Sequence, residues 1–283
     1  MIVFKVSSST GTLVSPAPLR FNVTMRSTPP ASFARYVALG DSSTEGVDDP
    51  DGGGGYRGWS QRLAERINAA QGGGLLYANL ATRGLTTGQV RERQLEAALV
   101  LRPDLATVFC GTNDVTAPRF DPVSVAADIA DMQLALVERG ATVLSFTLPD
   151  LTPLMPLARL IAPRIAALNQ ALAAASRASH AILVDFAAHP VATDRRLWSE
   201  DRIHANAAGH ARIAEALAQA LSLPGSNDAW QAPLPESPQT RAQWCAAEAR
   251  WMRQHLLPWI WDGLRGRSSA DGRGPKRATL APP

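Results

Sequence analysis

Short apolar runs alternate with longer amphipathic segments from Arg35 onward. The apolar runs have the length of buried strands and occupy residues 36–39, 75–80, 105–110, 142–148 and 181–186. Between them, apolar residues recur every three or four positions, which predicts helices over residues 58–70, 86–101, 123–140 and 157–178, with a last helix from Asn206. Strands that alternate with helices form parallel sheets covered on both faces. The pattern therefore predicts an α/β protein, a three-layer α/β/α sandwich with a mainly five-stranded parallel sheet.

The sequence changes character on both sides of this single predicted domain, which spans residues 35–223. The Ser-, Thr- and Pro-containing residues 1–34 predict a disordered extension, and residues 1–24 either belong to it or reflect the choice of start codon. A polar, Pro-containing linker is predicted over 224–240. The tail over 265–283 has five basic residues and one acid without apolar periodicity, which predicts disorder.

A tryptophan-rich segment lies between the linker and the tail, over residues 241–264. Its four tryptophans and its helical character fit two interpretations. The favoured one is a helix that packs on the main domain or on a second copy of the chain. The other is a helix at a membrane surface, because tryptophans beside basic residues suit the headgroup boundary.

Charge and cysteine content narrow the class of protein. The chain carries a formal net charge of +3, but residues 35–222 hold 17 basic and 20 acidic side chains, so the basic excess belongs to the ends. This distribution argues against a nucleic-acid-binding surface on the domain. Two distant cysteines, Cys110 and Cys245, indicate no disulfide framework. No apolar run is long enough for a membrane span and the start is a poor signal peptide, so the cytoplasm is the expected compartment.

Small polar residues follow the first predicted strand in the sequence ALGDSSTEG, residues 38–46. Gly40 permits a sharp bend, after which Ser42 projects from the strand end near a helix start. Free backbone N–H groups there can stabilise developing negative charge. Ser42 is therefore a candidate nucleophile, although the same residues also suit an ordinary turn with a helix cap.

The sequence DRIH, residues 201–204, precedes the last predicted helix. An acid three residues before a histidine can fold back so that the Asp201 carboxylate meets Nδ1 of His204 and leaves Nε2 facing a serine. A cap or surface role for His204 is the ordinary alternative. His189, four residues after Asp185, is the second choice for the base, and His210 lies inside the predicted helix.

Two further turns follow predicted strands. In VFCGTND, residues 108–114, the side-chain amide of Asn113 can face an oxyanion at the same edge of the sheet. In ANLATRGLTTG, residues 78–88, the backbone N–H of Gly84 can do the same, although glycine also has a steric reason to occupy a turn.

The ordered set GDSSTEG, NLATRG, GTND and DRIH resembles the four sequence blocks of the SGNH, or GDSL, hydrolase family, with its flavodoxin-like fold. The resemblance covers residues 36–221. It implies Ser42 as nucleophile, Asp201 and His204 as its activating pair, and the Ser42 N–H, Gly84 and Asn113 as the oxyanion hole. The residue after Ser42 is Ser43, where many relatives have a larger apolar residue.

The reaction implied by this resemblance is hydrolysis of a small carboxylic ester through an acyl-enzyme, by an esterase or lipase. It requires no cofactor, and the sequence contains no Cys or His cluster with the spacing of metal ligands. Two alternatives use the same residues: an acyltransferase and a carbohydrate O-deacetylase. A third is a non-catalytic module that binds a glycan or lipid. The sequence does not define an oligomeric state.

Overall fold

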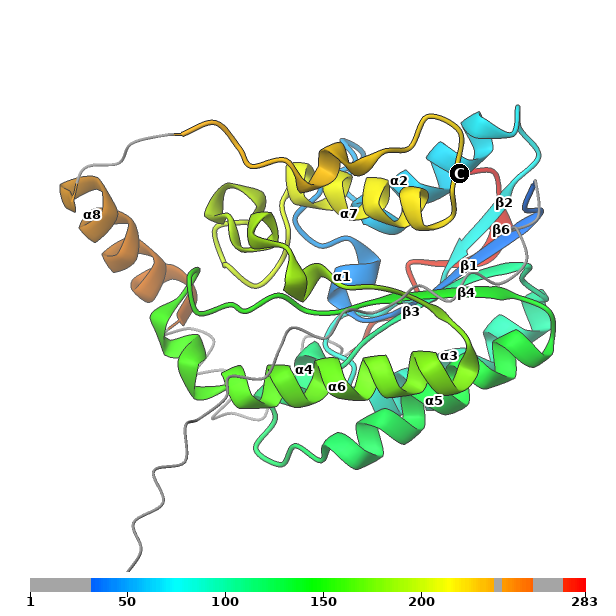
Figure 1. Ribbon diagram of the computed structural model, residues 1–283, viewed down its shortest axis with the longest axis horizontal. Coiled ribbons are helices and arrows are strands. Elements are labelled where there is room, and N and C mark those ends of the chain that lie inside the picture. The colour runs from blue at the N-terminus through cyan, green and yellow to red at the C-terminus, as the bar shows by residue number, and fades with distance from the viewer. Residues whose placement is uncertain (1–31, 237–240, 257–271) are drawn as a thin grey trace, which may run out of the picture.

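A six-stranded sheet forms the centre of the molecule, for which a computed structural model describes residues 32–236, 241–256 and 272–283 (Figure 1). The strands run in the order β5-β4-β3-β1-β2-β6, and all neighbours are parallel except β2 and β6. Their bounds are Arg35–Gly40 (β1), Leu76–Asn79 (β2), Leu105–Phe109 (β3), Thr142–Phe146 (β4), Ile182–Val184 (β5) and Arg277–Ala281 (β6). The predicted α/β class and the mainly parallel sheet are confirmed.

Helices cover both faces of the sheet. Figure 1 shows α3, α5 and α6 below the strands and α2 and α7 above them. The bounds are Ser42–Glu45 (α1), Gly58–Ala70 (α2), Thr87–Leu101 (α3), Thr112–Thr116 (α4), Pro122–Glu138 (α5), Ala162–Ser179 (α6), Ala207–Ala220 (α7) and Arg241–Trp251 (α8). Short side chains cap several of them: the Asn206 side chain accepts hydrogen bonds from the N–H groups of Ala208 and Gly209 and so begins α7 where the sequence predicts it.

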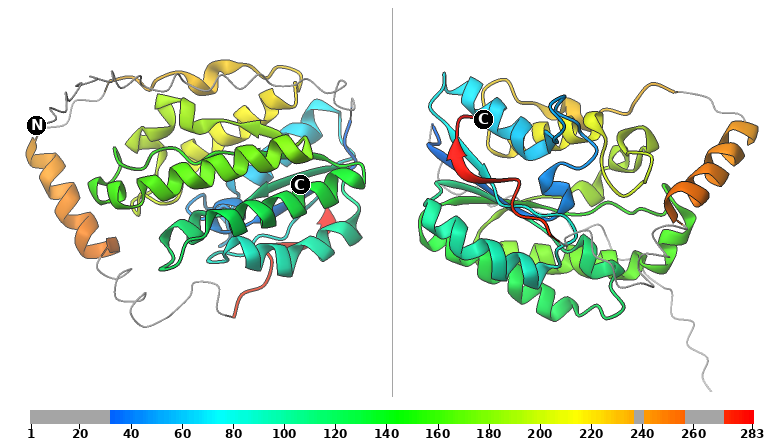
Figure 2. Two further views of the ribbon diagram at one scale, coloured as in Figure 1. Left: turned by 60° about the horizontal axis from the view of Figure 1, so that its bottom comes forward. Right: turned by 180° about the vertical axis from the view of Figure 1, so that it is seen from behind.

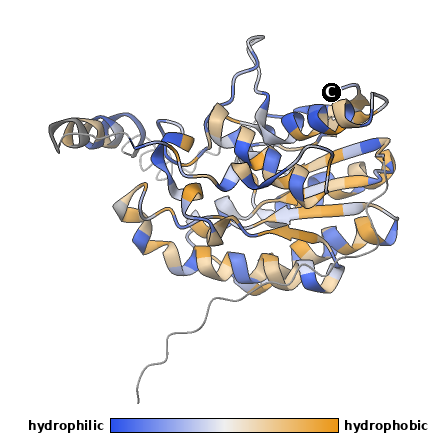
Figure 3. Ribbon diagram, turned by 45° about the horizontal axis from the view of Figure 1, so that its top comes forward, coloured by the Kyte–Doolittle hydropathy of each residue, from blue (hydrophilic) through white to orange (hydrophobic). Residues whose placement is uncertain are grey.

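The core lies on both sides of the central strands. Every residue of β3 is buried, as are residues 36–40 of β1, and β1 pairs with β3 from Tyr36 opposite Leu105 to Gly40 opposite Phe109. Figure 3 shows the largely hydrophobic strands of the sheet between helices that carry both hydrophobic and hydrophilic residues. This register brings the carboxyl ends of β1 and β3 side by side, where a crevice forms in sheets of this type.

One predicted helix is divided in the structure. The segment over 157–178 forms a 3₁₀ helix, Pro156–Leu160, and then α6, which begins at Ala162. Pro163 lies in the first turn of α6, where its missing N–H and fixed φ are tolerated, whereas in the middle of a longer helix it would remove a hydrogen bond and clash with the preceding turn.

The prediction of a disordered tail is wrong for residues 272–283. Residues Arg277–Ala281 form β6, which pairs antiparallel with β2, with Tyr77 opposite Ala281 and Asn79 opposite Arg277. Figure 2 shows this last strand beside β2. Without it, β2 would present a row of unpaired backbone groups at the edge of the sheet. The basic residues next to the strand led to the prediction of disorder for the sequence RATLA. In the structure, the backbone N–H of Lys276 donates to Ala81 O, and its ammonium group donates to Arg57 O.

The structure describes only part of the predicted terminal segments. The described residues do not include 1–31, 237–240 and 257–271. These ranges contain most of the predicted N-terminal extension and the last two tryptophans of the tryptophan-rich segment. Within the tryptophan-rich segment, α8 is followed by a short π-helix, Met252–Leu256. Both described cysteines are free. No helix in the described part of the chain is long and apolar enough to cross a membrane.

Candidate active site

The first site residue, Ser42, begins α1 at the carboxyl end of β1. Gly40 allows the sharp turn between them, because a Cβ on this residue would lie 2.2 Å from the carbonyl oxygen of Phe109 on the neighbouring strand. The side chain of Gln94 holds both the N–H and the C=O of Gly40, at 2.9 and 2.8 Å. The Asp41 side chain accepts a hydrogen bond from the N–H of Ser43 and caps the short helix. These contacts fix Ser42 at the strand end.

A tight loop carries the acid and the base. We call residues 198–205 the DRIH loop; its two ends form an antiparallel bridge between Trp198 and Ala205. Oδ1 of Asp201 accepts hydrogen bonds from the Ser199 hydroxyl and from the N–H groups of Ile203 and His204, at 2.5, 2.8 and 3.0 Å. One carboxylate oxygen thus folds the loop around itself and leaves Oδ2 free for the imidazole.

Ser42, His204 and Asp201 form a continuous hydrogen-bonded chain. Oδ2 of Asp201 lies 2.6 Å from Nδ1 of His204, and Nε2 of His204 lies 2.8 Å from Oγ of Ser42. A proton on Nδ1 makes Nε2 an acceptor for the serine hydroxyl. The structure therefore brings together three side chains whose identities and distances match those of a serine nucleophile, a base and an orienting acid.

Burial and hydrogen bonding act in opposite directions on the pKa values of Asp201 and His204. Burial alone would raise the pKa of Asp201, but the hydrogen bond and charge of His204, with the other donors to Asp201, hold this pKa well below its usual range. Burial would lower the pKa of His204, but the hydrogen bond to Asp201 and the negative charges of Asp201, Asp48 and Asp41 raise it. The acid is therefore ionised at neutral pH, and it favours the protonated form of the imidazole.

Asn113 and Gly84 lie in the two neighbouring turns. The Asn113 amide donates to the carbonyl oxygen of Leu85 at 2.9 Å, and its nitrogen lies 3.4 Å from Oδ2 of Asp41. Gly84 precedes Leu85 and has a φ of 81°, a left-handed conformation that favours glycine. Glu45 ties this turn to α1, because its carboxylate accepts from the N–H of Arg83 at 2.8 Å and pairs with the Arg83 guanidinium. Asn113 and the Gly84 turn thus meet beside Asp41.

Ser43 and the rival histidines have other partners. The Ser43 hydroxyl accepts from the indole N–H of Trp59 at 3.3 Å, whereas the Ser42 hydroxyl faces His204. His189 packs edge-on against Trp230, with ring centroids 4.7 Å apart. His210 is buried: its Nδ1 accepts from the backbone N–H of Trp59, and its Nε2 lies 3.0 Å from Val47 O. Burial lowers the pKa of His210 to about 4. The hydrogen bonds of His210 tie α7 to the start of α2.

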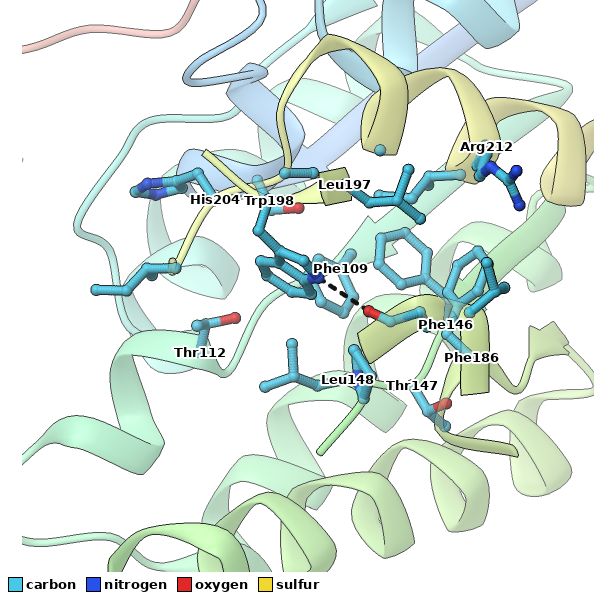
Figure 4. A pocket seen from close by; sticks show the side chains of 18 of the residues that line it. Phe109, Thr112, Phe146, Thr147, Leu148, Phe186, Leu197, Trp198, His204 and Arg212 are labelled. Carbon is cyan, nitrogen blue, oxygen red and sulfur yellow. Dashed lines mark hydrogen bonds between the residues drawn. The ribbon is translucent and has the colours of Figure 1, made fainter. Parts of the chain in front are cut away.

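An apolar cavity that is partly open to solvent is lined by Ser42 and His204. Aromatic rings from the ends of three adjacent strands line it: Phe109 and Phe146 stack 3.8 Å apart, and Phe186 meets Phe146 edge-on at 5.3 Å. Figure 4 shows His204 at one end, these rings and Trp198 in the middle, and Arg212 at the other end. Because parallel strands end at one edge of the sheet, residues far apart in sequence line one cavity.

Asp48, which the structure places beside the proposed base, was not predicted from the sequence, because it lies in no motif. One carboxylate oxygen of Asp48 lies 3.9 Å from Nδ1 of His204, and Asp48 has a left-handed φ of 69°. Potential metal ligands also lie close together here: one such atom from each of Asp48, Asp201 and His204 lies within 4.8 Å of the others, a spacing that suits a cation. A cation bound there would compete with the hydrogen bond between Asp201 and His204.

The fold and the site together define a family. The model of the GDSL-like Lipase/Acylhydrolase family matches residues 38–212. The chain is 31% identical over 196 residues to the GDSL lipase Rv0518 of Mycobacterium tuberculosis, covering 66% of this chain and 81% of that protein. The chain belongs to the GDSL-like lipase/acylhydrolase family, whose members are ester hydrolases.

Two solved structures share the fold. The psychrotrophic esterase EstA from Pseudoalteromonas sp. is 17% identical, with a TM-score of 0.53 over 67% of this chain and 97% of that chain. A catalytic mutant of Axe2, an acetylxylan esterase from Geobacillus stearothermophilus, is 16% identical, with a TM-score of 0.57 over 71% of this chain and all of that chain. At these identities the likeness concerns the fold alone.

Proposed function

We propose that this protein is a serine esterase that hydrolyses carboxylic esters through an acyl-enzyme formed on Ser42. The observation that carries the proposal is the hydrogen-bonded chain from Ser42 through His204 to Asp201, with distances of 2.8 and 2.6 Å. Membership of the GDSL-like family supports the same reaction.

In the proposed acylation step, His204 takes the hydroxyl proton while Oγ of Ser42 attacks the ester carbonyl. The tetrahedral intermediate collapses, and the protonated imidazole gives its proton to the departing alcohol. Water then attacks the acyl-enzyme with His204 again as base, which releases the acid and frees Ser42. Asp201 keeps the proton of the neutral ring on Nδ1 and stabilises the charged form. The raised pKa of His204 supports its role as base.

The oxyanion that forms during each attack needs preorganised donors. We assign this role to the backbone N–H groups of Ser42 and Gly84 and to the side-chain amide of Asn113. The amide has two N–H groups: it donates to Leu85 O at 2.9 Å and makes a longer hydrogen bond of 3.4 Å to Oδ2 of Asp41, which a bound oxyanion would replace. Removing one such donor typically costs about 2.7 to 4 kcal/mol of transition-state stabilisation.

The cavity supports an ester with an apolar acyl group. Its walls are mainly aromatic and aliphatic, and it opens at the proposed nucleophile. An acyl chain seated there leaves water, and each buried CH₂ contributes about 0.8 kcal/mol of binding. We therefore expect kcat/KM to rise with acyl length from acetyl until the chain fills the cavity.

The proposal is tested with chromogenic esters of increasing acyl length on the Ser42→Ala variant. We expect activity to fall by about a millionfold, to the background rate, because loss of the serine from a Ser-His-Asp triad has this effect. Folding should be unchanged. Ser43→Ala is the matched control and should retain activity, because it removes the neighbouring hydroxyl. Full activity of purified Ser42→Ala would refute the proposal. Partition of the acyl group between water and added alcohols measures the competing acyl transfer.

A further inference from the structure

Arg202 lies between the proposed acid and base in the DRIH loop, yet its side chain points into the protein. It is fully buried, with 0% exposure, and has a left-handed φ of 65°. A buried guanidinium is stable only when charged and hydrogen-bonded partners surround it. The residues that supply these partners therefore determine whether the DRIH loop can adopt this conformation.

Most of these partners come from α8. Glu248 accepts two hydrogen bonds from the Arg202 guanidinium, at 2.6 and 2.7 Å, in a bidentate pair. The guanidinium also lies over the ring of Trp251, 4.4 Å from its centroid, in a cation–π contact. Apart from α8, Leu154 O accepts one hydrogen bond at 3.1 Å. Within the described residues, Nε of Arg202 has no hydrogen-bond partner, so few contacts outside α8 hold this charge.

A second contact runs from α8 to the acid itself. The indole N–H of Trp251 donates to the backbone carbonyl oxygen of Asp201 at 3.1 Å, and Trp251 is only 6% exposed. The helix thus holds the backbone of Asp201 and the side chain of the next residue. α8 lies beyond residue 212, where the match to the family model ends, so these contacts are made by a segment outside the matched residues.

We infer that α8 is a positioning element of the active site, and that Glu248 and Trp251 hold the DRIH loop so that Asp201 and His204 stay aligned with Ser42. The inference rests on the proposed function of these three residues. The DRIH loop has no helix; one bridging pair and the hydrogen bonds to Oδ1 of Asp201 define its turn, and the contacts with α8 hold this turn against the rest of the protein. A displacement of about 1 Å can cost about 100-fold in rate.

Two substitutions in the full-length protein test this role. Trp251→Phe keeps an aromatic side chain beside Arg202 and removes the N–H that Asp201 O accepts, together with part of the indole ring. Glu248→Gln keeps the shape and removes the charge that pairs with Arg202. We expect kcat to fall about 10- to 100-fold in Glu248→Gln and less in Trp251→Phe, with KM within about twofold of wild type. The acid limb of the pH profile should move to lower pH, because a looser contact with Asp201 lowers the pKa of His204.

The controls are Arg250→Gln and Met252→Leu, exposed neighbours on the same segment, which should keep the wild-type kcat and pH profile. A wild-type kcat and pH profile in folded Trp251→Phe and Glu248→Gln would overturn the inference. If Glu248→Gln does not fold, Trp251→Phe alone decides. Loss of activity in both controls would also overturn it. Ser42→Ala, measured in parallel, tests the proposed function separately: its inactivity with an unchanged Trp251→Phe would refute only the role of α8.

Discussion

Replacing Asp41 by asparagine should stabilise the protein at neutral and alkaline pH, because the wild-type carboxylate must ionise inside the core. Asp41 is completely buried, and burial raises its pKa to about 7, although the hydrogen bond from the Ser43 N–H partly opposes this effect. A carboxyl group whose pKa rises from 3.8 to about 7 on folding reduces the free energy of unfolding by about 4 kcal/mol once it is ionised in both states.

The sign follows from which state releases its proton first. Below the unfolded pKa of 3.8, Asp41 is protonated in both states and has no effect. As the pH rises, the unfolded chain ionises while the folded protein keeps its proton, so the free energy of unfolding decreases until the pH passes about 7. Asparagine does not titrate, and its side-chain oxygen can still accept from the Ser43 N–H as a helix cap.

Urea unfolding followed by tryptophan fluorescence, at intervals from pH 4.5 to pH 8.5, measures this effect. We expect Asp41→Asn to be more stable than wild type by about 1 kcal/mol at pH 4.5 and by up to about 4 kcal/mol above pH 7. Subtracting the two curves cancels the titration of groups that both proteins share. A difference that is constant with pH, or a variant that is less stable at pH 8, would show that burial does not control this carboxyl group.

Two further substitutions test neighbours of the proposed base and nucleophile. Asp48→Asn removes a carboxylate 3.9 Å from Nδ1 of His204, a distance at which a charge contributes about 1 kcal/mol in water. The acid limb of kcat/KM between pH 5 and pH 8 should therefore move to lower pH by up to about one pH unit, and an unmoved limb would contradict this reasoning. Thr112 lines the cavity, and its buried hydroxyl has no hydrogen-bond partner among the described residues. Thr112→Val should raise the free energy of unfolding by about 1 kcal/mol, because it removes a buried hydroxyl that has no partner within the described part of the chain; a lower melting temperature would count against this reasoning.

The central fold could be predicted because each strand is a short apolar run followed by a turn. The helix Gly58–Ala70 begins and ends where its apolar spacing predicts. The division before α6 and the strand β6 were not predicted correctly. Pro163 fits a helix interior poorly and a first turn well, which periodicity alone does not distinguish. β6 forms by pairing with the backbone groups at the edge of β2. That this edge is open to pairing is apparent only from the three-dimensional structure.

The candidate site was predictable to the extent that its residues follow strands or precede a helix. Parallel strands bring the turns with Ser42 and Asn113 to one edge of the sheet, as the sequence order suggests. The surroundings could not be predicted in this way. Arg202 and Glu248 are 46 residues apart, and a charged residue inside a motif gives no indication that it is buried. The cavity likewise depends on the register that stacks Phe109 on Phe146.

The position of β6 has a consequence for the order in which the protein is completed during synthesis. Among the described residues, β6 follows the other five strands in sequence and lies at the edge of the sheet, beside β2, so the five parallel strands and their covering helices can assemble before it is synthesised. Until then, the edge of β2 is open to pairing with another nascent chain. Only the pairing of β6 with β2 closes that edge. A chain interrupted before Arg277 would therefore form a nearly complete domain that is unusually prone to aggregate.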